Sequence, residues 1–270
     1  NVPKPIMADY ENNIGIYEYI HGEHIADVKE EDINEACNFL VKLYELREKK
    51  ESEKIQRASA SCFSIAEITG IIDNRLNKLL GTGEINENYR KLHDYLNLEF
   101  LSNYNEILSW SKRRINDYGL NFNSEIENKE RTLSPSDFGF HNALRKENGE
   151  IVYLDFEFFG WDDPAKMISD FVLHPGMNLK ETYKRRFIRN LIDNFKDNKN
   201  LENRVKVVYP LVGLVWCLIT LNEFLPLDLE RRKFSNEAID EELQIKQLAK
   251  SENLLRKIKM EYKYELKDLL

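Results

Sequence analysis

The spacing of apolar side chains predicts three helices before residue 120 and four more after residue 163. In the first three stretches apolar positions recur every three or four residues, as they do along one face of an α-helix. The predicted helices cover about residues 31–49, 65–79, 87–117, 165–173, 180–197, 201–225 and 236–267. Gly81 and Gly119 follow the second and third of them, and glycine is common just past a helix end.

Residues 14–20 and 151–157 carry β-strand patterns instead. The first stretch is dense in β-branched and aromatic side chains and runs into a turn at His21-Gly22. The second has the sequence Ile-Val-Tyr-Leu-Asp-Phe-Glu and follows Asn148-Gly149, a dipeptide typical of hairpin turns. The strand should therefore fold back on the segment that precedes it.

This hairpin is expected to gather four oxygen-bearing side chains. Asp137 and Asn142 lie before the turn, and Asp155 and Glu157 end the strand after it. Magnesium prefers such oxygen ligands and is usually held by one or two carboxylates together with substrate phosphates. Asn142 and Asp155 are the predicted metal ligands, and Asp137 would orient an attacking hydroxyl and accept its proton. Glu157 would support a second metal or anchor the turn.

Composition and charge exclude several other classes. The 270 residues are 42% hydrophobic and 32% charged, which is typical of a folded globule. The formal net charge is -8, and basic residues alternate with acidic ones, so no basic face for nucleic acid is expected. Cys37, Cys62 and Cys217 are odd in number and far apart, which argues against a disulfide framework or a zinc site and favours a cytoplasmic protein.

Residues 205–225 are apolar enough to approach the length of a membrane span. They nevertheless contain Lys206, Pro210, Asn222 and Glu223. A helix enclosed in a protein core is also apolar on all sides, so we interpret this stretch as a core helix and expect no membrane span.

Residues 133–171 resemble the aminoglycoside phosphotransferase and choline kinase-like family, whose lobes are similar to those of protein kinases. Asp137 and Asn142, in Ser-Asp-Phe-Gly-Phe-His-Asn, resemble the catalytic-loop Asp and Asn of that family. Asp155 resembles its metal-binding Asp, and residues 160–164 resemble the turn that follows. By the same resemblance, Asp170 would brace the catalytic loop.

The resemblance implies an α+β, protein kinase-like fold. Residues 1–22 would form the end of a small β lobe and the hinge, and residues 23–270 a helical lobe with the site at 133–171. The backbone of Glu18, Tyr19 and Ile20 would then hydrogen-bond adenine. Most of the small lobe is expected to lie outside this chain, because no Gly-rich loop or strand lysine precedes the hinge. The implied activity is transfer of the γ-phosphate of ATP to a hydroxyl of an amino sugar, a sugar or an amino alcohol.

Departures from the family pattern leave alternatives open. Pro135 stands where the family usually has His, two residues before the catalytic Asp, and His141 is interpreted as a packed loop residue. One alternative is therefore a nucleotide-binding pseudokinase or regulatory module without turnover. A second is a metal-dependent phosphoester hydrolase that uses Asp137, Asp155 and Glu157, although it leaves the hinge-like segment unexplained.

Overall fold

The computed structural model describes the chain except residues 10, 13, 84–85, 226–240, 265 and 267–270. Parts of the predicted helix at 236–267 therefore lie outside the described residues. The chain divides into two compact units, each built from two separate stretches of sequence. The first contains residues 1–61 and 128–199, and the second contains the described residues of 62–127 and 200–266.

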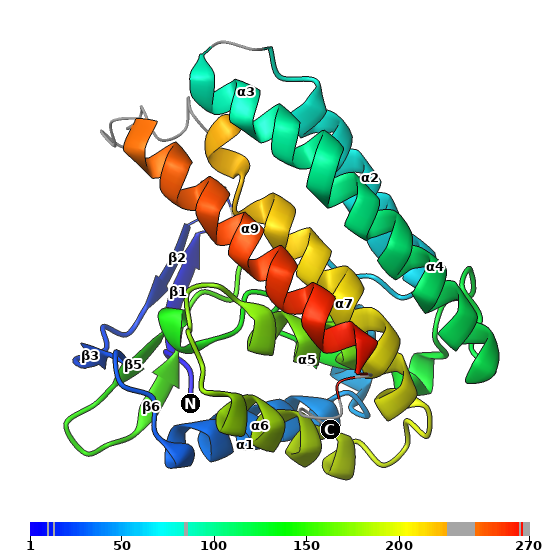
Figure 1. The fold of residues 1–270 in the computed structure, drawn as a ribbon. Coiled ribbons are helices and arrows are strands. Elements are labelled where there is room, and N and C mark those ends of the chain that lie inside the picture. Colours follow the sequence, from blue (N-terminus) through cyan, green and yellow to red (C-terminus); the bar gives the residue numbers. More distant parts are fainter. Residues whose placement is uncertain (10, 13, 84–85, 226–240, 265, 267–270) are drawn as a thin grey trace. The chain divides into compact units, whose positions relative to one another are not determined.

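The first unit combines short strands with three helices (Figure 1). Its strands are β1 (Pro5–Asp9), β2 (Ile14–Tyr17), β3 (Glu23–His24), β4 (Thr132–Ser134), β5 (Ala143–Arg145), β6 (Ile151–Tyr153) and β7 (Gly160–Asp162). Its helices are α1 (Glu30–Leu46), α5 (Pro164–Leu173) and α6 (Glu181–Asn194), with single 3-10 turns at Lys50–Lys54, Asn128–Glu130 and Phe140–Asn142. Strands pair antiparallel as β1-β2, β3-β5-β6 and β4-β7, and α1, α5 and α6 pack beside β4 or one another.

A buried ion pair attaches α1 to this set of strands. The Asp32 carboxylate, 3% exposed, accepts hydrogen bonds from both terminal nitrogens of Arg145 on β5, at 2.7 and 2.8 Å. Asp32 also accepts the backbone N–H of Lys29 at 2.7 Å, which satisfies one of the unpaired donors at the start of the helix. The first turn of α1 is thereby fixed against β5.

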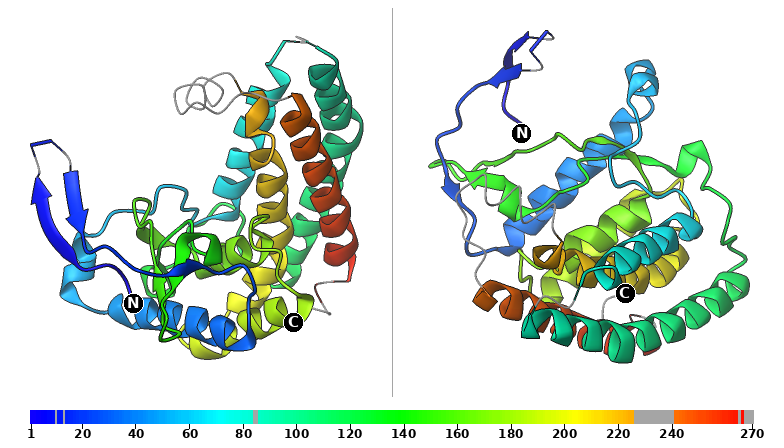
Figure 2. Two further views of the ribbon diagram at one scale, coloured as in Figure 1. Left: turned by 90° about the vertical axis from the view of Figure 1, so that its left-hand side faces the viewer. Right: turned by 90° about the horizontal axis from the view of Figure 1, so that it is seen from above.

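The second unit is a helical bundle. It contains α2 (Ile65–Leu80), α3 (Glu87–Asp94), α4 (Leu101–Asp117), α7 (Leu201–Ile219) and α9 (Glu241–Lys263), with a π-helical stretch at Tyr95–Phe100 and a 3-10 turn at Asn222–Phe224. Helix α7 packs against α2, α4 and α9, and the two further views in Figure 2 show it alongside α2 and α9. One described helix, Leu201–Phe224, is long and apolar enough to cross a membrane, and 67% of that apolar window is buried inside the protein. These contacts support the interpretation of α7 as a core helix.

Most predicted helices are confirmed within a few residues where the structure describes them, but the one predicted at 201–225 ends at Ile219 and the one at 87–117 contains the π-helical stretch Tyr95–Phe100. Three predictions near the strands were wrong in detail. The strand predicted at 14–20 ends at Tyr17. The strand predicted at 151–157 ends at Tyr153, because Asp155 adopts a left-handed backbone with φ 61°. Residues 160–162, predicted as part of a turn, form β7 and pair with β4. The remaining two residues of the predicted turn begin α5, with Asp163 as its N-cap and Pro164 as its first residue.

Candidate active site

The loop that carries Asp137 runs from β4 to β5 and is anchored by two buried phenylalanines. Phe138 and Phe140 are 6% and 2% exposed, and their rings lie 5.6 and 5.8 Å from that of Phe171 on α5. Asp137 and His141 flank this buried pair and are themselves only half-buried. The alternation of apolar and polar residues in the loop therefore fixes its backbone and leaves the polar side chains accessible.

The backbone just before Asp137 is strained. Ser136 has φ 68°, and the N–H of Asp137 donates to the carbonyl of Pro135 at 3.0 Å, which closes a γ-turn. The hydroxyl of Ser134 accepts the N–H of Ser136 at 3.0 Å and supports this conformation. A non-glycine residue in such a conformation costs about 1–3 kcal/mol, and strain of this kind clusters at functional sites.

Three side chains converge on Asp137. The Nε2 atoms of His141 and His174 lie 3.1 and 3.7 Å from the same carboxylate oxygen, Oδ1. The Nδ2 of Asn142 donates to the backbone carbonyl of Asp137 at 3.0 Å and to Oδ2 at 3.3 Å. The hydrogen bond from His141, the nearby His174 and the bond from Asn142 lower the pKa of Asp137 below its usual value, so the carboxylate is ionised at neutral pH.

His174, which follows the end of α5, stacks on His141. The two rings are parallel to within 1°, with their centroids 3.9 Å apart. Burial, reinforced by the proximity of His141, lowers the pKa of His174 to about 4. The backbone N–H of Gly176 donates to His174 Nδ1 at 3.1 Å, so Nδ1 is an acceptor and the proton of the neutral ring is on Nε2.

Asp137, His141 and His174 would be close enough to share a metal ion, since their ligand atoms lie within 4.8 Å of one another. The hydrogen bonds argue against that role. His174 presents an N–H to Asp137, and an ionised carboxylate can only accept, so His141 also presents Nε2–H. A nitrogen that carries a proton has no lone pair for a metal. The trio is therefore a carboxylate hydrogen-bonded by His141, with the Nε2–H of His174 3.7 Å from the same oxygen.

Glycine is favoured at position 139 because two side chains approach it closely. Gly139 is extended, with φ 174°, so its backbone would accept any residue. A Cβ there would lie 2.5 Å from the Sδ of Met177 and 2.6 Å from Nδ1 of His141. Met177 also accepts the N–H of Phe140 at 3.2 Å. The ring of His141 thus packs closely against the backbone at Gly139.

Asn142 and Asp155 are brought together through the backbone. The N–H of Leu154 donates to the carbonyl of Asn142 at 2.8 Å, which places Asp155 one residue beyond that contact. Because the Asn142 amide nitrogen faces two acceptor oxygens of Asp137, its side-chain oxygen points elsewhere. Asp155 is exposed, and no described residue forms a hydrogen bond or ion pair with its carboxylate. The amide oxygen of Asn142 and the carboxylate of Asp155 are thus available to bind a metal ion.

The two predicted support residues lie on the loop after β6 and on α5. Glu157 is exposed in the loop between β6 and β7. Asp170 Oδ2 lies 2.6 Å from Nζ of Lys166, whose ammonium also lies 3.4 Å from the fully buried Asp162. In the sequence Asp162, Lys166 and Asp170 are spaced four residues apart, and the structure places Asp162 at the end of β7 and the other two on α5; Lys166 was not singled out from the sequence.

The predicted hinge residues lie between β2 and β3. The N–H of Glu18 donates to the carbonyl of Lys4 at 2.9 Å, and its carboxylate accepts the N–H of Lys4 at 3.0 Å. Tyr19 is 82% exposed, with its ring edge-on to that of His21 at 4.9 Å. No described residue hydrogen-bonds the carbonyl of Glu18 or the N–H of Ile20.

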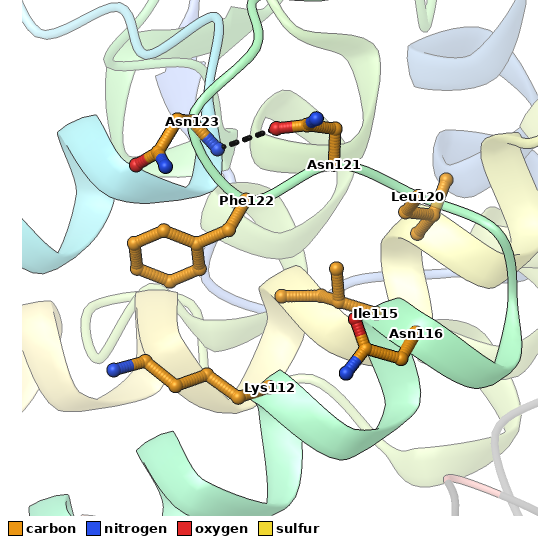
Figure 3. Close-up of a pocket in the computed structure, with 7 residues that line it drawn as sticks. All are labelled: Lys112, Ile115, Asn116, Leu120, Asn121, Phe122 and Asn123. Atoms are coloured by element: carbon orange, nitrogen blue, oxygen red, sulfur yellow. Dashed lines mark hydrogen bonds between the residues drawn. The ribbon is translucent and has the colours of Figure 1, made fainter.

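A separate hollow of about 540 Å³ lies in the helical unit, between the end of α4 and the loop that follows it (Figure 3). The ammonium of Lys112 lies 5.4 Å from the ring centroid of Phe122, and Asn121 accepts the backbone N–H of Asn123 at 2.9 Å. None of the predicted site residues lines this hollow.

Sequence reasoning missed His174 and Met177, and it treated His141 as a packed residue. The contact of His174 with Asp137 depends on where the chain returns after α5, and no local pattern encodes that return. His141 did carry a signal, since it lies four residues after Asp137 in a loop of alternating polar and apolar residues.

No protein-family model matches the chain, and no curated protein sequence matches it. Solved structures do match. A choline/ethanolamine kinase family protein from Mesorhizobium loti is 13% identical, with a TM-score of 0.53 over 99% of this chain and 78% of that one. A spectinomycin phosphotransferase, solved with ADP and spectinomycin, is 10% identical, with a TM-score of 0.55 over 97% of this chain and 77% of that one. An aminoglycoside phosphotransferase from Alicyclobacillus acidocaldarius is 12% identical, with a TM-score of 0.51 over 97% and 78%.

Identities this low establish the fold and leave activity open. The comparisons do not confirm the prediction that most of a small β lobe lies outside the chain, and the predicted boundary at residue 22 stays a prediction. The predicted architecture is confirmed at the level of the fold: the chain has the kinase-like fold of the choline/ethanolamine kinases and aminoglycoside phosphotransferases.

Proposed function

We propose that this protein is a small-molecule kinase that transfers the γ-phosphate of ATP to a hydroxyl group of its acceptor. The observation that carries the proposal is Asp137 itself: an ionised carboxylate on a strained turn, held by His141 and Asn142. The solved structures that share this fold include a choline/ethanolamine kinase family protein, a spectinomycin phosphotransferase and an aminoglycoside phosphotransferase. We expect it to act in the cytoplasm on an amino sugar, a sugar or an amino alcohol.

Asp137 would act as the catalytic base. Its carboxylate orients the acceptor hydroxyl and takes its proton as the oxygen attacks the γ-phosphorus. The lowered pKa keeps this carboxylate ionised at neutral pH. A weak base suits phosphoryl transfer, because positioning and charge stabilisation supply most of the catalysis in this reaction class.

Asn142 and Asp155 fit a magnesium ion. The amide oxygen of Asn142 points away from Asp137, and the carboxylate of Asp155 has no partner among the described residues. Magnesium is commonly held by one or two such oxygens, with water and substrate phosphates completing its shell. When bound, the ion would neutralise charge on the phosphates. Glu157 and Asp170 would support the site from outside this pair.

The segment from Glu18 to Ile20 would hold the adenine base. A purine edge offers one donor and one acceptor, which match a backbone carbonyl and a backbone N–H. The carbonyl of Glu18 and the N–H of Ile20 make no hydrogen bond to described residues, whereas the N–H of Glu18 is already donated to Lys4. Tyr19 would then serve through its backbone rather than its exposed ring.

The test uses the full natural chain and measures ATP consumption against a panel of sugars, aminoglycosides and amino alcohols. Asp137→Asn should lower turnover of the active acceptor by a factor on the order of 10² to 10⁴, because it removes the base. Nucleotide binding, measured by calorimetry, should be unchanged. Asp193→Asn is the matched control, since Asp193 is an exposed carboxylate on α6.

Each alternative has a distinct outcome. An unaffected rate in Asp137→Asn refutes the assignment of the base. Nucleotide binding with no turnover of any acceptor identifies a pseudokinase, and metal-dependent cleavage of a phosphoester without ATP identifies a hydrolase.

A further inference from the structure

The two histidines beside Asp137 contact a single oxygen of its carboxylate. His141 Nε2 lies 3.1 Å and His174 Nε2 3.7 Å from Oδ1, while the other oxygen, Oδ2, is approached by Asn142 Nδ2 at 3.3 Å. The two carboxylate oxygens therefore have different surroundings. Oδ1 faces the Nε2 atoms of two imidazoles, of which that of His141 lies within hydrogen-bonding distance, and Oδ2 accepts one hydrogen bond, from Asn142.

Both rings are themselves fixed. His174 is held by the N–H of Gly176 at 3.1 Å, which leaves its proton on Nε2. His141 is stacked on His174 at 3.9 Å and closes against Gly139, where a Cβ would meet its Nδ1 at 2.6 Å. Nδ1 of His141 is buried and has no hydrogen-bond partner among the described residues, so a proton placed there would be a buried donor without an acceptor. The proton of the neutral His141 ring is thus also on Nε2.

The sequence before Asp137 offers no comparable support. Pro135 and Ser136 precede it, and the hydroxyl of Ser134 is engaged with the backbone N–H of Ser136. Side chains that orient a base must therefore come from later in the chain. His141 and His174 meet that need from the same loop and from the end of α5.

We propose that His141 and His174 are positioning residues that hold Asp137 through Oδ1 and leave Oδ2 as the oxygen that accepts the proton of the acceptor hydroxyl. This inference rests on the proposed function. In the step, the hydroxyl oxygen forms a bond to the γ-phosphorus as the bond from that phosphorus to the β–γ bridging oxygen breaks. The hydroxyl proton passes to Oδ2, ADP leaves, and Asp137 later releases the proton to water.

The kinetic test compares two substitutions at each ring. Leu removes the donor, whereas the amide nitrogen of Gln reaches about as far as Nε2 and keeps a donor. We expect His141→Leu to lower kcat roughly 10- to 100-fold, as for a lost hydrogen bond to a charged group, while KM for ATP changes less than about twofold. His141→Gln should recover most of the rate. His174 lies farther from Oδ1, so His174→Leu should lower kcat less, by roughly 3- to 10-fold, again with rescue by Gln. His24→Gln, on an exposed strand residue, is the control.

Equal kcat values for the Leu and Gln variants of His141, or a loss confined to KM, would overturn the positioning role. A second measurement does not depend on activity. Nitrogen-15 NMR of the histidine rings should show both His141 and His174 as Nε2–H tautomers. A proton on Nδ1 of either ring refutes the arrangement. Absence of wild-type turnover with both rings as Nε2–H refutes the proposed function and leaves the geometry standing.

Discussion

The low pKa of His174 predicts a specific loss of stability in mild acid. Folding lowers its pKa from 6.5 to about 4 because the ring is buried beside His141, although Asp137 acts in the opposite direction. A folded-state pKa below the unfolded one means that the unfolded chain binds the proton more tightly. The contribution of His174 to stability is therefore complete above pH 6.5 and is lost as the pH falls towards 4.

The size of the effect follows from these two values. Between pH 7 and pH 4.5 the linkage relation gives a loss on the order of 2–3 kcal/mol in the free energy of unfolding. The side chain is only 16% exposed, so solvent screening reduces this figure little. His174→Gln replaces the ring with a group that does not titrate and should not show this loss.

The assay is urea unfolding of both proteins at the two pH values, with equal slopes required so that midpoints report stability. Carboxylates elsewhere in the chain are also protonated in acid and change the stability of both proteins equally. Their contribution cancels when the stability loss of one protein is subtracted from that of the other. We expect the wild type to lose on the order of 2–3 kcal/mol more than His174→Gln. An identical loss in the two proteins would refute the buried, neutral state assigned to His174.

Three further substitutions test packing and charge. Gly139→Ala should destabilise the fold by about 1–3 kcal/mol and lower kcat, because the new methyl group meets Met177 and pushes His141 from Asp137. Gly70→Ala on α2, where a Cβ meets no atom within 4 Å, should instead stabilise the fold by about 0.5–1 kcal/mol. Thermal unfolding of the two glycine variants measures whether each is less or more stable than the wild type. A Gly139→Ala protein with wild-type stability and kcat would contradict the prediction for Gly139. Arg145→Leu should cost about 3–5 kcal/mol in urea unfolding, because it leaves the buried Asp32 carboxylate without its partner; a loss below about 1 kcal/mol would show that the pair is dispensable.

Local patterns predicted much of the fold because they depend on near neighbours in sequence. Apolar positions every three or four residues located the described helices, and Asn148-Gly149 located the hairpin between β5 and β6. The strands were harder. Gly160 to Asp162 became β7 because β4 pairs with it, and that pairing joins residues far apart in sequence.

The candidate site shows the same division. By itself the sequence determined the loop of Asp137 and Asn142 and its connection to Asp155, because a hairpin with short connections forces those segments together. Only the tertiary structure decided that His174 stacks on His141 and that both face one oxygen of Asp137. That arrangement depends on how α5 packs on the phenylalanines of the loop, and contacts between distant segments leave no periodic trace in a single sequence.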